Sequence, residues 1–273
     1  MHVFYINLDR DQERRAFFES NFKENNKCGW TCARVSAVDK NTIADGPYAA
    51  TMSKGAVGLS LTHRKTVEMS KGCNGHVMIA EDDILFGPHS QEVISRCIAS
   101  TDPRKWDIMF TDVCIPRVVD MLKMMGMRRQ KAGKMSIIDL KTVLFAGTTG
   151  LIINHHSKDK YLRLLGDEAL FSKPIDMLIA DYAHKGVHNC VCTFPFATSL
   201  SRYADQSEIQ KSDTFTENFL WNAFRRAIWA DRKIEEVSAS LESLPAPLVN
   251  QEALVVSRIA ASLFMNEALK HTN

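Results

Sequence analysis

The stretch His76-Val77-Met78-Ile79-Ala80-Glu81-Asp82-Asp83 is an apolar run that ends in three consecutive acids. Such a run predicts a buried strand, and ligands in open α/β sheets bind at the carboxyl ends of strands. Because side chains at i and i+2 of an extended segment share a face, Glu81 and Asp83 can point at one ligand while Asp82 points elsewhere. The triplet fits a clamp for a metal ion and a diphosphate. It fits equally well a helix-capping or turn cluster, in which Asp82 or Asp83 caps whatever follows Ile84.

Strand and helix patterns alternate on both sides of this stretch. Apolar and β-branched runs predict further strands at 3–6, 30–38, 107–110, 142–153 (a pair) and 187–194. Helical periodicity predicts helices at 11–25, 58–70, 157–165 and 176–184. This alternation favours an α/β fold with a mostly parallel central sheet covered by helices. Strand patterns stop near residue 207, so we expect one α/β domain over 1–209 and a helical C-terminal extension over 210–273.

Composition excludes several classes of protein. The chain has 273 residues, 45% of them hydrophobic, and a formal net charge of +2, which is far from the basic excess of a dedicated nucleic-acid binder. We therefore expect no nucleic-acid partner. The seven cysteines are odd in number and scattered, which favours reduced thiols over a disulfide scaffold. No secretory signal pattern begins the chain and no apolar run reaches about 20 residues, so we expect a cytoplasmic protein whose membrane contact, if any, is peripheral at the inner face.

Six motifs follow one another in a set order. They are Val3-Phe4-Tyr5-Ile6-Asn7-Leu8-Asp9-Arg10 with Arg14-Arg15 after it, Val35-Ser36-Ala37-Val38-Asp39, Gly55 to His63, Val77 to Asp83, Gly147 to Ile153, and Lys173-Pro174-Ile175-Asp176. This order resembles glycosyltransferase family 25, which includes bacterial lipooligosaccharide galactosyltransferases and collagen galactosyltransferases. The resemblance runs from about residue 3 to residue 210. Leu59 stands where the family usually has Cys and Thr62 where it has Ser, and both departures bear on packing more than on chemistry.

The resemblance implies a Rossmann-like domain of the GT-A type and an enzyme of lipopolysaccharide biosynthesis. Such an enzyme transfers a hexose, usually galactose, from a UDP-sugar to a hydroxyl of a glycan or glycolipid acceptor such as lipooligosaccharide, with inversion at the anomeric carbon. The departing UDP carries charge that a Mn²⁺ or Mg²⁺ ion held by Glu81 and Asp83 would neutralise as a Lewis acid. The acceptor hydroxyl needs a general base, for which we select Asp176. Asp at a helix start is also an ordinary N-cap, and Asp181 is the reserve candidate.

The same resemblance assigns the donor nucleotide to a group of residues near the first strands. They are Asn7, Leu8, Arg10, Arg14, Asp39, His63 and Asp82. Among the arginines we favour Arg10 for the phosphates, because Arg14 and Arg15 also fit surface positions on a helix. Asp39 can accept hydrogen bonds from ribose or uracil, or it can serve a turn. His63 would orient a loop or the diphosphate, although a histidine on a helix more often packs in the core.

Two further segments are rich in apolar residues. The stretch 117–134 mixes methionines with arginines and lysines, and core packing is the first interpretation, ahead of a mobile lid over the acceptor or contact with an anionic bilayer. The tail 210–273 contains Phe215, Phe219, Trp221, Phe224 and Trp229, so it must pack on the domain, a membrane face or a second subunit. A homodimer is one of these options.

Two other functions compete with sugar transfer. A metal-dependent nucleotidyltransferase would share the first strands and the paired acids, but the chain has no Gly-x-x-x-x-Gly-Lys-Ser/Thr loop. A catalytically inactive relative that binds a nucleotide or a partner protein is the other, and the presence of Glu81, Asp83 and Asp176 together argues against it.

Overall fold

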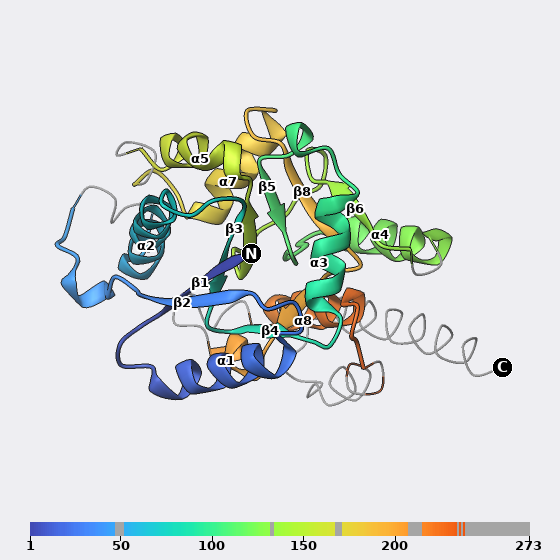
Figure 1. Cartoon of the computed structure of the whole chain (residues 1–273), viewed down its shortest axis with the longest axis horizontal. Coiled ribbons are helices and arrows are strands. Elements are labelled where there is room, and N and C mark those ends of the chain that lie inside the picture. Colours follow the sequence, from blue (N-terminus) through green and yellow to red (C-terminus); the bar gives the residue numbers. More distant parts are fainter. Residues whose placement is uncertain are drawn as a thin grey trace.

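The computed structural model describes residues 1–46, 52–131, 134–166, 171–206 and 215–233, together with 235 and 237. Helices lie on both sides of a central sheet (Figure 1). The sheet has the order β2-β1-β3-β7-β5-β8-β6, and a separate two-stranded sheet joins β4 and β9. The strands are β1 His2–Asn7, β2 Thr31–Ser36, β3 Val77–Glu81, β4 Ile84–Phe86, β5 Ile108–Phe110, β6 Ser136–Asp139, β7 Gly150–Ile153, β8 Cys190–Phe194 and β9 Thr198–Leu200.

Five of the seven strands in the large sheet run in one direction. β1 is parallel to β2 and β3, and β5 is parallel to β8, whereas β7 is antiparallel to both β3 and β5, and β6 is antiparallel to β8. The sheet is therefore mostly parallel, as expected. Since β7 runs the other way, the residues that precede it meet the carboxyl ends of β1, β3 and β5 at one edge.

Alternating side chains of the central strands build two cores. Phe4 and Ile6 of β1 lie in the core cluster that includes residues of α2, α5 and α7, whereas Val3 and Tyr5 lie in the cluster that includes residues of α1 and α3. The period of two follows from the pleat of the strand. The helices are α1 Gln12–Asn25, α2 Lys54–Ser70, α3 Ser90–Ala99, α4 Val118–Lys131, α5 Lys158–Leu164, α7 Ile175–His184 and α8 Phe215–Ile228.

Most of the expected elements are confirmed, and the differences have local causes. Helix α2 begins at Lys54, ahead of the expected residue 58, because the Ser53 hydroxyl accepts a hydrogen bond from the Ala56 amide at 3.2 Å and caps the helix. The expected strand pair at 142–153 is wrong in its first half. Only Gly150–Ile153 forms a strand, and Ala146 makes an isolated bridge to Cys114. Helix α3 and the short strands β4, β6 and β9 were not predicted.

The two apolar segments pack on the core where the structure describes them. Met121, Met124 and Met125 of α4 are buried, which confirms core packing for this part of the stretch 117–134. Phe224 and Ile228 of α8 are buried in the same cluster. The remaining residues of the expected tail, 210–214, 234, 236 and 238–273, lie outside the described residues, and the division at residue 209 stays a prediction.

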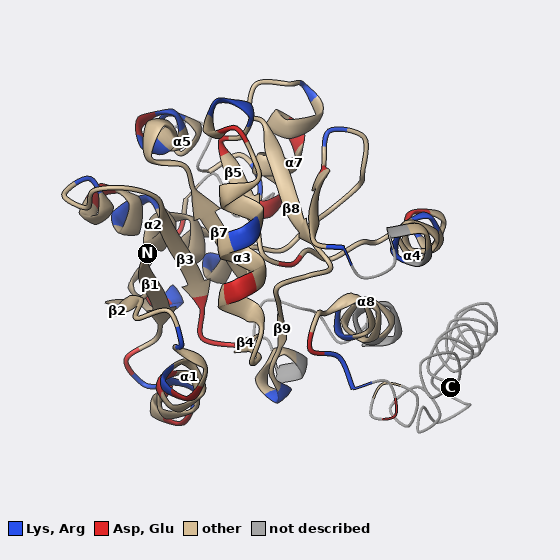
Figure 2. Cartoon of the chain, turned by 45° about the vertical axis from the view of Figure 1, so that its right-hand side comes forward, with Lys and Arg blue, Asp and Glu red and all other residues tan. Residues whose placement is uncertain are grey.

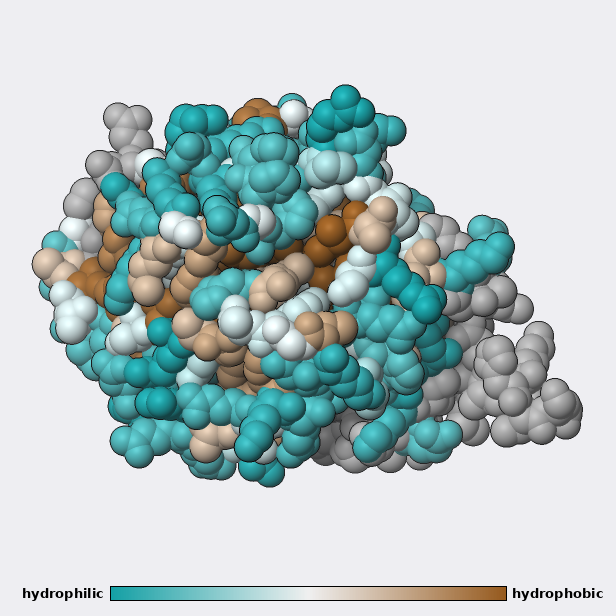
Figure 3. Space-filling view, viewed as in Figure 1, coloured by the Kyte–Doolittle hydropathy of each residue, from teal (hydrophilic) through white to brown (hydrophobic). Residues whose placement is uncertain are grey.

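The surface and the helices bear on contact with a membrane. Figure 3 shows a mostly hydrophilic face on which hydrophobic residues gather in a band across the middle. Among the described residues, none of the helices is both long and apolar enough to cross a membrane.

Candidate active site

A cavity of about 340 Å³ lies at the carboxyl edge of the sheet. The ends of β1 and β3, the segment after β2 and the start of α2 all contribute to its wall. The lining residues are Ile6, Asn7, Leu8, Arg10, Asp11, Arg14, Ala37, Val38, Lys40, Ser53, Lys54, Gly55, Leu59, Thr62, Glu81, Asp82 and Asp83. The volume is in the range of small-molecule sites, roughly 300–1,000 Å³. The cavity therefore joins the acidic triplet to a group of basic residues.

The acidic triplet lies where β3 ends and the chain turns toward β4, which Figure 2 shows as the red end of β3. Glu81 is the last residue of β3, and Asp82 and Asp83 form the turn. A strand follows, and the next helix, α3, begins only at Ser90. The helix-capping form of the alternative is therefore wrong, whereas its turn form agrees with the turn at Asp82 and Asp83.

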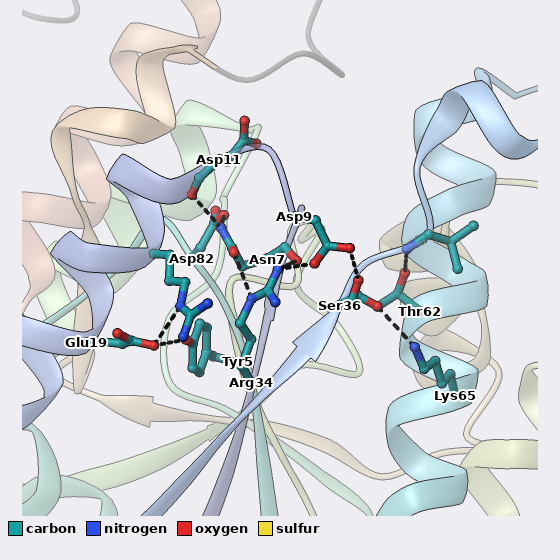
Figure 4. Close-up of polar contacts among 12 residues, drawn as sticks. Tyr5, Asn7, Asp9, Asp11, Glu19, Arg34, Ser36, Thr62, Lys65 and Asp82 are labelled. Carbon is teal, nitrogen blue, oxygen red and sulfur yellow. Dashed lines mark hydrogen bonds and ion pairs between the residues drawn. The ribbon is translucent and has the colours of Figure 1, made fainter.

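Asp82 is held by side chains of α1 and β1, and Figure 4 shows the contact with Asn7 of β1. The Arg14 guanidinium donates from Nε to Asp82 Oδ1 at 2.8 Å, and Asn7 Nδ2 donates to Asp82 Oδ2 at 2.7 Å. Asn7 is itself fixed, because its Oδ1 accepts from Arg34 Nε of β2 at 3.0 Å. Asn7 and Arg14, two of the residues that the resemblance assigns to the donor nucleotide, line the cavity. In this structure their side chains contact Asp82 and position the acidic turn.

The charges of Glu81 and Asp83 are offset by fewer hydrogen bonds and ion pairs than the charge of Asp82. The Thr148 hydroxyl donates to Glu81 Oε1 at 2.7 Å, but burial, and next the repulsion from Asp83, raise the pKa of Glu81 to about 8. Burial raises the pKa of Asp83 to about 6, against the opposing charge of Arg14, which lies 3.7 Å away. Asp83 Oδ1 is buried with no hydrogen-bond partner among the described residues. A cation beside the two carboxylates would relieve both penalties.

The side chains at the triplet supply only part of the ligands that a divalent ion needs. In the part of the chain that the structure describes, no three His, Cys, Asp or Glu side chains are grouped so as to hold a metal. Glu81 and Asp83 alone supply two carboxylates. Mg²⁺ is commonly bound by one or two carboxylates together with water and substrate phosphates, so a bound diphosphate would have to complete the shell.

Of the other residues that the resemblance assigns to the donor nucleotide, some line the cavity and some do not. Leu8 and Arg10 line it. Asp39 is not among the lining residues. It forms an ion pair with Arg10 and caps the short helix Lys40–Thr42 by accepting from the Asn41 amide at 2.8 Å. Its turn role is thus observed.

His63 lies in the core rather than at the cavity. It is fully buried on α2, and its Nδ1 lies 3.2 Å from the Tyr161 hydroxyl. Burial lowers the pKa of His63 to about 3, so the ring is neutral. The structure therefore favours the packing interpretation of this histidine.

Asp176 lies near Glu81 but is not among the residues that line the cavity. It is the second residue of α7, after the N-cap Pro174, and its Oδ2 accepts from the Gly147 amide at 3.0 Å. Gly147 adopts φ +87°, a conformation that favours glycine and aims this amide at Asp176. Asp176 is near enough to contribute to the raised pKa of Glu81. The reserve candidate, Asp181, forms an ion pair with Lys173.

Sequence reasoning missed a polar cluster behind the triplet. Arg225 of α8 donates to Asp112, which follows β5, and to the Thr149 hydroxyl at 2.8 Å. One signal was present in the sequence. Arg225 stands four residues after Trp221 and three before Ile228, so it lies on the apolar face of its helix, where a charge needs a partner.

The fold and the site together define an α/β protein with a charged ligand cavity at the carboxyl edge of its sheet. Residues 1–179 match the model of glycosyltransferase family 25, which is described as an LPS biosynthesis protein. The chain belongs to this family and is a glycosyltransferase. The match confirms the family inferred from the six motifs and ends before β8 and α8. No curated protein matches the chain.

Proposed function

We propose that this glycosyltransferase transfers a hexose, namely galactose, from a UDP-sugar to a hydroxyl of a glycan acceptor such as lipooligosaccharide. The transfer inverts the configuration at the anomeric carbon and uses a divalent metal ion. The observation that carries the proposal is a cavity whose lining includes both the acids Glu81 and Asp83 and the basic residues Arg10, Arg14, Lys40 and Lys54. A nucleoside diphosphate bound to a metal ion has the complementary distribution of charge.

The basic wall suits the diphosphate. Arg10, Lys40 and Lys54 line the cavity, and Ser53, Lys54 and Gly55 form the first turn of the 17-residue helix α2. The positive end of a helix dipole and its unpaired amides bind phosphate. The apolar lining residues Ile6, Leu8, Val38 and Leu59 would pack against the nucleobase and the ribose.

The acidic wall suits the leaving group. Glu81 and Asp83 would hold Mn²⁺ or Mg²⁺, which supplies Lewis-acid neutralisation of the diphosphate as it departs. The unpaired Asp83 Oδ1 supports this role, because an ion would provide its missing partner.

Asp176 would accept the proton of the acceptor hydroxyl. The Gly147 amide and the Met177 amide, which donates to Asp176 Oδ1 at 2.9 Å, hold its carboxylate in one orientation, as positioned bases require. Transfer then proceeds as the hydroxyl oxygen attacks the anomeric carbon, its proton passes to Asp176, and the bond to UDP breaks.

The test is UDP release from a panel of UDP-sugars in the presence of Mn²⁺, Mg²⁺ or EDTA. We expect release from one donor, lost with EDTA and in the variants Asp83→Asn and Asp176→Asn. The matched control is Asp159→Asn, because Asp159 is exposed on α5 and forms an ion pair with Lys71 far from the acidic triplet in the sequence. Loss of release in the control as well would contradict a specific role for the two acids.

The alternatives give different outcomes in the same assay. A nucleotidyltransferase would release pyrophosphate when given UTP and a sugar 1-phosphate, and no UDP. An inactive relative would bind UDP in a metal-dependent way and release none from any donor, including when lipooligosaccharide acceptors are supplied.

A further inference from the structure

Arg225 is a buried cation that reaches the active-site edge from α8, beyond the part of the chain that the family model covers. Its side chain is 6% exposed, and the side chain of its partner Asp112 is fully buried. Asp112 also accepts a hydrogen bond from the Thr198 hydroxyl of β9 at 2.9 Å. The cluster thus ties α8 to the ends of β5 and β9.

The second contact of Arg225 leads to the acids of the site. Its Nη2 donates to the Thr149 hydroxyl, and the Thr149 carbonyl accepts from the Glu81 amide at 2.8 Å. In the same loop the Thr148 hydroxyl bonds the Glu81 carboxylate, and the Gly147 amide bonds Asp176. Three consecutive residues therefore contact both proposed reactive carboxylates on one side and Arg225 on the other.

We propose that Arg225 is a positioning residue of the active site, which fixes the loop 147–149 and through it the orientation of Glu81 and Asp176. Arg225 is not among the residues that line the cavity, so it acts through the loop rather than on the substrate. The inference rests on the proposed roles of these two acids in sugar transfer. It also makes α8 part of the site and not only a cover for the core.

The chemistry of the side chain explains why arginine stands here. Both hydrogen bonds leave one nitrogen, Nη2, whose two hydrogens lie in the guanidinium plane, so Asp112 and Thr149 are held in fixed directions from that atom. A lysine at the same position would keep a charge for Asp112, but its ammonium rotates on a flexible stem and does not fix the direction of the Thr149 contact. The variant Arg225→Lys therefore tests the contact with Thr149 separately from the ion pair with Asp112.

The test compares Arg225→Lys, Thr149→Val and the double variant. We expect kcat to fall about tenfold in each single variant, the double variant to be no worse than either, and the Kd for UDP to change less than about twofold, because the residues share one path and do not touch the nucleotide. Exchange of the Glu81 and Gly147 amide hydrogens with solvent should quicken about tenfold in the same variants, since both amides donate within the loop network.

Arg128→Lys is the matched control. Arg128 Nη1 also ties α8 to the rest of the fold, by donating to the Ile228 carbonyl at 2.6 Å, but it makes none of the loop contacts. It should lower the midpoint of thermal unfolding and leave kcat and the two amide exchange rates unchanged. Equal effects of Arg128→Lys and Arg225→Lys on all readouts, or additive losses in the double variant, would overturn the inference.

The two proposals can fail separately. If the parent protein transfers no sugar from any UDP donor, the proposed function is wrong, while the amide exchange rates still decide whether Arg225 controls the loop. If Arg225→Lys does not fold, Thr149→Val carries the test, because it removes the loop contact without disturbing the ion pair between Arg225 and Asp112.

Discussion

Arg14 of α1 donates to Asp82 at 2.8 Å and so compensates the middle acid of the triplet, while Glu81 and Asp83 on either side of it keep raised pKa values. The three acids are therefore chemically different. Asp82 anchors the turn to the fold, whereas burial and the charges of nearby carboxylates destabilise the ionised forms of its two neighbours. Such destabilised carboxylates are typical of groups placed for binding or catalysis rather than for stability.

The pairing of Arg14 with Asp82 predicts a stability effect. Arg14→Gln should reduce the free energy of unfolding by about 2–4 kcal/mol, because it leaves Asp82 largely buried with only Asn7 as partner. Arg15→Gln is the control, because Arg15 makes an exposed pair with Glu19 and should change the free energy by less than about 1 kcal/mol. Urea unfolding monitored by circular dichroism measures both. Equal effects would show that Asp82 does not depend on Arg14.

The raised pKa of Glu81 predicts a pH dependence. In the folded state the pKa is about 8, against an ordinary value of 4.5, so the folded state binds this proton more tightly than the unfolded state does. Its contribution to stability is complete below pH 4.5 and is lost as the pH rises through 8.

Glu81→Gln removes this titration. The variant should be more stable than the parent at pH 8, with a difference that shrinks toward pH 5, and it should lose transferase activity. Glu68→Gln, at an exposed position on α2, should show no such trend. Thermal unfolding across this pH range gives the answer, and a stability gap that does not vary with pH would contradict the prediction.

Close packing of α2 beside the cavity predicts the effect of one methyl group. A Cβ at Gly58 would lie 2.6 Å from the Val38 carbonyl oxygen, which is backbone and can move only with its whole segment. Gly58→Ala should therefore destabilise the fold by about 1–3 kcal/mol and weaken UDP binding several-fold, because Val38 and Leu59 line the cavity.

Gly126→Ala is the matched control for this prediction. Nothing lies within 4 Å of a Cβ at Gly126 of α4, so alanine should raise stability by up to about 1 kcal/mol through its higher helix propensity. Calorimetric titration with UDP and urea unfolding measure the two quantities. Normal UDP affinity in Gly58→Ala would place the nucleotide elsewhere.

The proposed metal site predicts stabilisation by added ions. At a Mn²⁺ concentration 100 times its Kd, the free energy of unfolding should rise by about 2.7 kcal/mol in the parent. Asp83→Asn should abolish most of the gain, and Asp159→Asn should keep it. Thermal shift with and without UDP provides the measurement, and UDP should enlarge the shift because Glu81 and Asp83 supply only part of a coordination shell. A gain of the same size in Asp83→Asn would place the ion at another site.

The sequence predicted those parts of the site that lie within one strand or helix. The apolar run before Glu81 identified both β3 and the acids at its end, and the motif order identified the family. Contacts between distant segments gave no local signal. Asp112 and Arg225 are 113 residues apart, and Thr148 meets Glu81 across 67 residues, so only the folded sheet brings them together. The short strand β4 was missed because its partner is distant in sequence: Ile84 pairs with Leu200 of β9.

The position of Arg225 bears on how this enzyme can be recombined with its relatives. A chimera joined near residue 209, made to exchange acceptor preference by swapping the tail, would also exchange the counter-ion of Asp112 and one support of the loop 147–149. A foreign tail without a basic residue at the matching position would leave a buried carboxylate uncompensated. Junctions that transfer the whole of α8 together with the residues around Asp112 and Thr149 should yield active hybrids more often than junctions that separate them.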